Sequence, residues 1–270
     1  MPNCTYLSKE EKSAPGYKVG KERLTLLFGA NASGDLNVKP LLVYLAENPR
    51  AFKGIFKSQL PVIWKSNKKA WVTLMVFKDW FNDHFVPAVE RYRALKGLPF
   101  KVLLVLDNGP GHRANLSNMH PNVKVVYLPP NTTSLIQPMN QGVFANFKAH
   151  YLRRTIPSAL RAVEGNKLTL KQFWKGCNIA DAVKNIACAW DEVKMTTLNG
   201  AWKKMCPQFV NSFEGFEQAE DVETLTRKIV GLNKRLKLDL ETEDVTELLA
   251  SHGEQLSSED LIEVEKQMIE

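Results

Sequence analysis

Two polar positions in this sequence are suited to metal-dependent chemistry. Asp107 directly follows the apolar run Val102–Leu106, and Asn140 lies in the polar segment 137–142. Parallel α/β sheets bind their ligands at the carboxyl ends of the strands, where Asp107 is expected. Two-metal phosphoryl transfer needs several carboxylates that converge on two Mg²⁺ ions. The pair therefore indicates a phosphoryl-transfer site in which one position is a neutral amide, with capping of a turn by Asp107 as an equal alternative.

Seven further residues are candidates for contacts with a nucleic acid. They are Lys65, Lys68, Lys69, His112, Lys148, Arg153 and Arg154. The first three lie between Trp64 and Trp71, a pattern that suits phosphate contacts combined with aromatic stacking. His112 shares the loop of Asp107 and could contact a phosphate or a metal-bound water. The simpler alternatives are tryptophans in the core with solvated lysines between them, a turn hydrogen bond for His112, and helix-end charge for the last three residues.

Charge is distributed unevenly along the chain. Residues 214–270 hold 6 Lys and Arg against 16 Asp and Glu, a net charge of −10, whereas residues 1–213 hold 30 against 13, a net charge of +17. A basic body suits a polyanionic partner, with ordinary solvated charge as the alternative. No apolar run reaches the roughly 20 residues of a membrane helix. Four Cys without CxxC spacing and five scattered His give no zinc-site pattern.

The order of the predicted elements indicates an α/β fold. Strands are expected at 23–30 and 38–44, joined by a turn, and at 102–106 and 123–128. The last two are continuous apolar runs, typical of parallel strands buried on both faces, and a short helix within 112–119 would complete a βαβ unit. Residues 46–70 show no regular pattern. Helical spacing is found at residues 77–96, at residues 168–206 and over much of 217–270. A further helix is expected to begin at Pro138 and to end near Arg153 and Arg154.

Six longer segments carry a resemblance that single residues cannot. They are Asp107–His112, Tyr127–Ser134, Gln137–Gly142, Ser8–Gly16, Trp64–Val72 and Thr197–Lys204. Together they closely resemble the DDE superfamily endonuclease domain of pogo/Tigger transposases, a group that includes Tigger-derived, Jerky-like and centromere protein B-like proteins. The resemblance covers nearly the whole chain.

This resemblance implies a ribonuclease H-like fold, a mixed sheet flanked by helices, and a triad of Asp residues that binds Mg²⁺ in the ancestral family. Asp107 matches the second Asp of the triad, and Asn140 stands at the position of the third. The family's first Asp belongs to a segment that precedes the residues with which this chain opens. Asn offers a neutral oxygen and no negative charge, so we expect no tightly bound Mg²⁺ and no strand cleavage.

The resemblance also implies that the first, central strand of the sheet is missing here. We therefore expect a split or gapped sheet that is weakly stable. The expected units are residues 1–160 as a truncated ribonuclease H-like DDE domain, 161–213 as its helical completion, and 214–270 as an acidic helical tail. We expect the family's helix-turn-helix DNA-binding domains to be absent as well, with a fragment or a gene model begun at an internal Met as an equal alternative.

These observations lead to a prediction of function. We expect a nuclear, transposase-derived domain that binds DNA non-specifically through its backbone, without endonuclease activity and without a membrane or small-molecule partner. The acidic tail could dock a protein partner, with a solvated appendage as the default. The alternatives are a protein-interaction module that has lost DNA binding, and an active Mg²⁺-dependent endonuclease in which Asp35 or Glu11 replaces a missing carboxylate.

Overall fold

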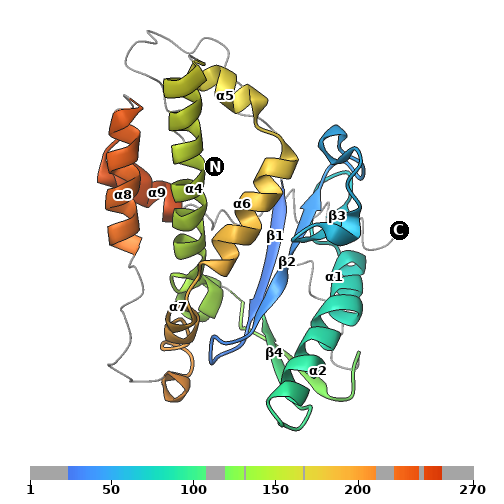
Figure 1. Cartoon of the computed structure of the whole chain (residues 1–270). Helices are drawn as coiled ribbons and strands as arrows, with labels where there is room; N and C mark the ends of the chain where they lie inside the picture. Colours follow the sequence, from blue (N-terminus) through green and yellow to red (C-terminus); the bar gives the residue numbers. More distant parts are fainter. Residues whose placement is uncertain are drawn as a thin grey trace.

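The computed structural model describes residues 24–107, 119–130, 132–166, 168–210, 222–236 and 240–250. Within these ranges two small sheets pack against helices, so the chain is of the α/β class (Figure 1). Most of the helix expected within 112–119, the candidate His112 and the alternative ligand Glu11 lie outside the described residues. None of the described helices combines the length and the apolar character needed to cross a membrane.

The larger sheet has the strand order β1-β2-β3, with β1 at Thr25–Ala30, β2 at Asn37–Tyr44 and β3 at Ile63–Ser66. β1 and β2 form an antiparallel hairpin, as the strand pattern predicts, whereas β3 pairs in parallel with β2. β3 corrects the expectation that residues 46–70 are irregular. The hairpin turn requires Gly34, because its φ is +78° and an added Cβ would clash with the carbonyl oxygen of Met195.

The smaller sheet consists of two parallel strands, β4 at Val102–Leu106 and β5 at Val123–Tyr127. Both strands lie where the apolar runs predict them. Among the described strands β4 pairs with β5 and not with β1, and a missing central strand between them stays a prediction. One face of β4 and β5 packs into the core, but on the other face the side chain of Leu103 is 59% exposed. Within the described part of the chain, this sheet is thus covered mainly on one side.

A continuous helical segment covers one face of both sheets. It comprises α1 (Leu74–Trp80), a π-helical turn η3 (Phe81–Phe85) and α2 (Val86–Leu95), close to the helix predicted at 77–96. The hydroxyl of Thr73 accepts a hydrogen bond from the N–H of Val76, which satisfies a free donor at the start of α1. Its apolar side chains form one cluster with residues of β2, β3, β4 and β5. This layer therefore holds the two sheets next to each other.

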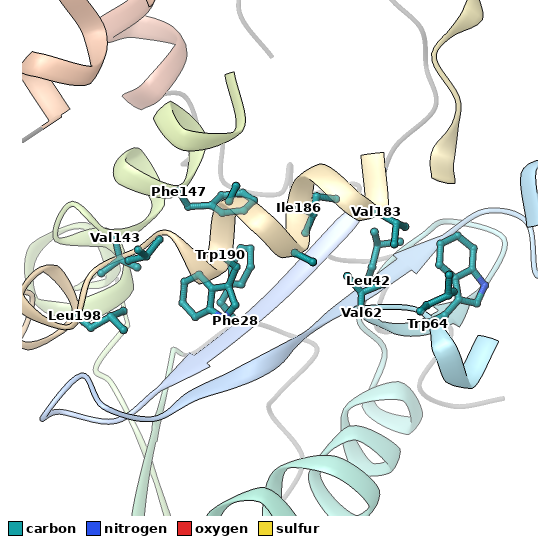
Figure 2. Close-up of a cluster of buried hydrophobic side chains, with 14 of the residues drawn as sticks. Phe28, Leu42, Val62, Trp64, Val143, Phe147, Val183, Ile186, Trp190 and Leu198 are labelled. Atoms are coloured by element: carbon teal, nitrogen blue, oxygen red, sulfur yellow. The ribbon is translucent and has the colours of Figure 1, made fainter. Parts of the chain in front are cut away.

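Helices α4 (Val143–Asn166) and α6 (Ile179–Asp191) lie on the opposite face of the larger sheet (Figure 1). Figure 2 shows Phe28 of β1 and Trp190 of α6 at the centre of this core, with ring centroids 4.4 Å apart. The indole N–H of Trp190 also donates to the carbonyl of Val38, at 3.1 Å. The remaining short elements of this region are η1 (Arg50–Phe52), η2 (Lys57–Gln59), α3 (Thr133–Ile136), η5 (Pro138–Asn140), α5 (Leu170–Gly176), α7 (Met195–Gly200) and η6 (Pro207–Phe209).

The acidic tail contributes two helices, α8 (Val222–Arg235) and α9 (Thr242–Ala250), that pack on α4. Leu225, Ile229 and Leu249 are fully or almost fully buried in a third cluster with residues of α4. The described part of the tail is therefore attached to the body and is not a solvated appendage. The unit boundary expected at residue 160 falls inside α4, and the division into three units stays a prediction.

Candidate functional site

Asp107 lies at the end of β4, directly after the buried Leu106, and is itself half-buried. The N–H of Leu128 donates to the carbonyl of Leu106 at 2.8 Å, which continues the pairing one residue beyond β5. The chain that leads toward Asn140 therefore leaves the sheet beside Asp107. This is the strand-end position at which α/β sheets bind ligands.

Asn140 is the last residue of the 3₁₀ turn η5, two residues before Gly142, whose φ of +89° separates the turn from α4. Consequently the helix that Pro138 was expected to open begins only at Val143. The side-chain amide nitrogen of Asn140 donates to the carbonyl of Thr133 at 3.2 Å and to Oε1 of Gln137 at 2.7 Å.

These two hydrogen bonds fix the chemistry of position 140. A backbone carbonyl can only accept, so the group that faces Thr133 has to be the NH₂ of the amide. A carboxylate at position 140 would place an acceptor against that carbonyl and leave the hydrogen bond unmade. Asn140 therefore acts as a donor that ties η5 to α3, a role that an ionised Asp could not fill.

The donor set around these positions does not fit a tightly bound Mg²⁺. The ion prefers several oxygen ligands, usually with one or two carboxylates. In the described ranges, no three His, Cys, Asp or Glu side chains are grouped as a metal site requires. Asp107 supplies a single carboxylate, and Asn140 can offer only a neutral amide oxygen.

Asp35, the alternative carboxylate, is occupied in the β1–β2 turn. Its Oδ1 accepts hydrogen bonds from Asn31, Ser33 and Tyr92 at 2.7–2.8 Å, and its other oxygen lies 2.9 Å from Nζ of Lys96. Burial raises the pKa of Asp35, but the hydrogen bonds outweigh this and hold the pKa far below its usual range. The carboxylate therefore ties the hairpin turn to α2, with its oxygens committed to these partners.

The three candidate lysines, Lys65 within β3 and Lys68 and Lys69 after it, differ in their surroundings. Nζ of Lys65 lies 2.6 Å from Oδ2 of Asp79, and the side chain of Lys68 is exposed. The ammonium of Lys69 lies 5.4 Å from the ring centre of Trp71. The turn that holds Lys68 and Lys69 is organised by Asn67, whose side chain forms hydrogen bonds with the backbone of Lys69 and Trp71. Trp64 is buried in the core, as the simpler alternative states. The role of the three lysines in DNA binding stays a prediction.

The candidates on α4 make specific intramolecular contacts. Nζ of Lys148 donates to the carbonyls of Leu248 and Leu249, each at 3.3 Å, at the end of α9, and burial lowers the pKa of Lys148. Arg153 and Arg154 hold the carboxylate of Glu192 at 2.8 and 2.6 Å. These contacts give Lys148, Arg153 and Arg154 a structural role. A role of the same residues in nucleic-acid binding stays a prediction.

Sequence reasoning missed the partner of the two arginines. Burial raises the pKa of Glu192, but the hydrogen bonds from Arg153 and Arg154 outweigh it, so the pKa lies below its usual value. The buried ring of His150 adds a contact, with Nδ1 3.0 Å from the same carboxylate. The spacing of His150, Arg153 and Arg154 on one face of a helix was the available signal, but only the packing of α4 on α6 identifies Glu192.

Comparisons with known proteins agree with the sequence motifs. The model of the DDE superfamily endonuclease family matches residues 21–202. The human Jerky protein homolog is 36% identical over 225 residues, which are 83% of this chain and 37% of that protein. The human Tigger transposable element-derived protein 7 is 33% identical over 244 residues, 84% of this chain and 44% of that protein. The fission yeast (Schizosaccharomyces pombe) CENP-B homolog protein 1 is 25% identical over 198 residues, 70% of this chain and 36% of that protein.

The chain thus spans less than half the length of these curated relatives. No solved structure gives a significant match. Because the family model covers well over half of the chain, the chain belongs to the DDE superfamily endonuclease family.

Proposed function

We propose that this chain is a transposase-derived DDE domain of ribonuclease H-like arrangement that binds DNA and does not cut it. The observation that carries the proposal is the pair of hydrogen bonds from the amide of Asn140 to Thr133 and Gln137. They give position 140, which we match to the third position of the ancestral triad, a donor role and leave it only a neutral amide oxygen to offer a metal ion. We propose that the local structure supports the loss of catalysis together with the loss of one charge.

The energetic consequence concerns the metal ions. Two-metal catalysis depends on ions that activate the attacking oxygen and stabilise the leaving one, and carboxylates supply the charge that holds them. With Asp107 as the matched carboxylate in this chain, we expect Mg²⁺ to bind weakly. Without tightly bound metal ions, the site would give little electrostatic stabilisation to the transition state of strand cleavage.

The DNA-binding half of the proposal rests on charge and on relatives. Residues 1–213 carry a net charge of +17, and one relative is named a homolog of the centromere protein CENP-B. Cationic residues that contact phosphates give binding that does not depend on sequence. We propose the nucleus as the location for the same reason, because the partner is there.

The test of DNA binding is its dependence on salt. Fluorescence anisotropy of the full chain with two labelled duplexes of unrelated sequence, between 50 and 300 mM NaCl, gives log K against log salt. We expect a slope of about −0.9 for each phosphate contacted and similar affinities for both duplexes. A slope near zero, or no binding at 50 mM NaCl, would overturn the proposal in favour of a protein-interaction module.

A further inference from the structure

The loop between β2 and β3 displays an apolar pair to solvent. The side chain of Phe56 is 71% exposed and that of Ile55 is 41% exposed. They follow Gly54, whose φ of +80° reverses the chain at that point. In Figure 1 this loop is the blue segment at the upper right, beyond β3. Single exposed apolar side chains are common on protein surfaces, so the role of this pair depends on what supports and surrounds it.

The loop packs on the core beneath this pair. Phe52 is buried and packs edge-on against Trp64, with ring centroids 4.6 Å apart. The indole N–H of Trp64 donates to the carbonyl of Glu47 at 3.1 Å, and the 3₁₀ turns η1 and η2 flank the exposed pair on either side. Phe56 is therefore held out by a fixed support, so that insertion into a partner would not require the loop to order first.

The surroundings of the pair are basic. Residues 45–60 contain Arg50, Lys53 and Lys57 against one acidic residue, Glu47, which pairs with Lys57 at 3.2 Å. The turn after β3 adds the exposed Lys68 beside the C-terminal end of β2, where this loop begins, because β2 and β3 run in parallel. An apolar tip between cations is complementary to stacked bases between phosphates.

We infer that Phe56, supported by Ile55, is a wedge that inserts between stacked bases of DNA, while Lys53 and Lys57 contact the phosphates on either side. The two exposed apolar side chains are too few for a stable protein interface, which buries about 1,200 Å² or more. Base stacking needs only one ring or branched side chain for each step. This inference rests on the proposed function and adds to it the mode of contact.

The test uses the full chain and a duplex that carries 2-aminopurine, whose fluorescence rises when a neighbouring base is unstacked. We expect wild-type protein to raise the fluorescence and Phe56→Ala to abolish the rise, with an affinity lowered about tenfold to a hundredfold. The conservative variant Phe56→Leu should retain most of both signals, since Leu also acts as a wedge. The matched control is Met75→Ala, which removes a 74% exposed side chain from α1 and should change neither signal.

The salt dependence separates the two kinds of contact. Phe56→Ala should leave the slope of log K against log salt unchanged, whereas the double variant Lys53→Gln, Lys57→Gln should reduce its magnitude by about 1 to 2. Because these side chains are exposed, or nearly so, melting temperatures should match the wild type.

Each adverse result has its own meaning. Wild-type protein that binds no DNA at 50 mM NaCl overturns the proposed function. DNA binding by Phe56→Ala that equals the wild type overturns the wedge alone. Binding to anionic phosphatidylserine vesicles that is lost in Phe56→Ala while DNA binding is unchanged also overturns the wedge and assigns the loop to a membrane surface.

Discussion

At the scale of single residues, Asn140 is the position that we propose corresponds to the third carboxylate of the family's triad. An Asp and an Asn have nearly the same shape, yet only the amide can donate to the carbonyl of Thr133. In the structure this amide has local partners, the carbonyl of Thr133 and the side chain of Gln137. An Asp at position 140 is therefore expected to destabilise the fold around it.

The variant Asn140→Asp tests this role. We expect it to lose about 1–3 kcal/mol of the free energy of unfolding, because two donated hydrogen bonds disappear and a carboxylate faces a carbonyl. Asn140→Ala, which removes the donors without adding charge, should lose less. Chemical denaturation of the three proteins at pH 7 measures the difference, and an Asp variant as stable as the wild type would refute the donor role.

A second residue-scale prediction concerns Glu192, whose carboxylate contacts Arg153, Arg154 and His150. Because its pKa is lowered in the folded state, its contribution to stability is present above the ordinary carboxyl pKa and is lost as the pH falls through the lowered value. We expect Glu192→Gln to be less stable than the wild type by about 1–3 kcal/mol at pH 7. The gap should close in acid, as urea unfolding from pH 7 to pH 3 would show.

A gap that stays constant down to pH 3 would contradict this account of Glu192. The exposed Glu223, which pairs with Arg227 within α8 at 3.6 Å, provides the matched control. Glu223→Gln should change stability by no more than about 0.5 kcal/mol at any of these pH values.

At the scale of elements, the tail helices depend on their contact with α4. We expect Leu225→Ala to cost about 2–5 kcal/mol of the free energy of unfolding, because the fully buried side chain leaves a cavity between α8 and α4. Leu95→Ala, which truncates an 81% exposed leucine on α2, is the control and should be nearly neutral. Equal and small effects of both variants in urea denaturation would show that α8 does not pack on the body.

The elements differ in how far the sequence predicts them. β1, β2, β4 and β5 carry apolar runs or alternation, and each is found within about two residues of its expected bounds. β3 is only four residues long, and its parallel pairing with β2 comes from tertiary packing that no local pattern encodes. Likewise Pro138 is typical of a helix start. The positive φ of Gly142 is not helical, however, and α4 begins after it, at Val143.

The candidate site was predictable in position and only partly in chemistry. The strand-end location of Asp107 follows from the apolar run before it. The bonds of Asn140 to Thr133 and Gln137, and those of Lys148 to the end of α9, depend on backbone groups brought close by folding. Sequence spacing cannot reveal such partners, because a carbonyl acceptor is present at every residue.

At the scale of the whole molecule, the two sheets differ in protection. The larger sheet has helices on both faces, whereas the side chain of Leu103 on the second sheet remains exposed. Two-stranded sheets are marginal on their own, so β4 and β5 should open more readily than β1 and β2. Hydrogen exchange followed by mass spectrometry should show faster exchange of the amides of β4 and β5. Equal protection of the two sheets, or a highly cooperative melt at high temperature, would contradict the expected weak stability.

The central claim, that this DDE domain binds DNA without cutting it, is tested most directly by a nicking assay on supercoiled plasmid. The full chain is incubated with plasmid in 10 mM Mg²⁺, beside the variant Asp107→Ala and a mock preparation, with plasmid retention measured on the same samples. The account predicts retention of the plasmid and a rate of nicking that is the same for all three samples. Nicking by the wild type that exceeds the mock preparation and disappears in Asp107→Ala would contradict it.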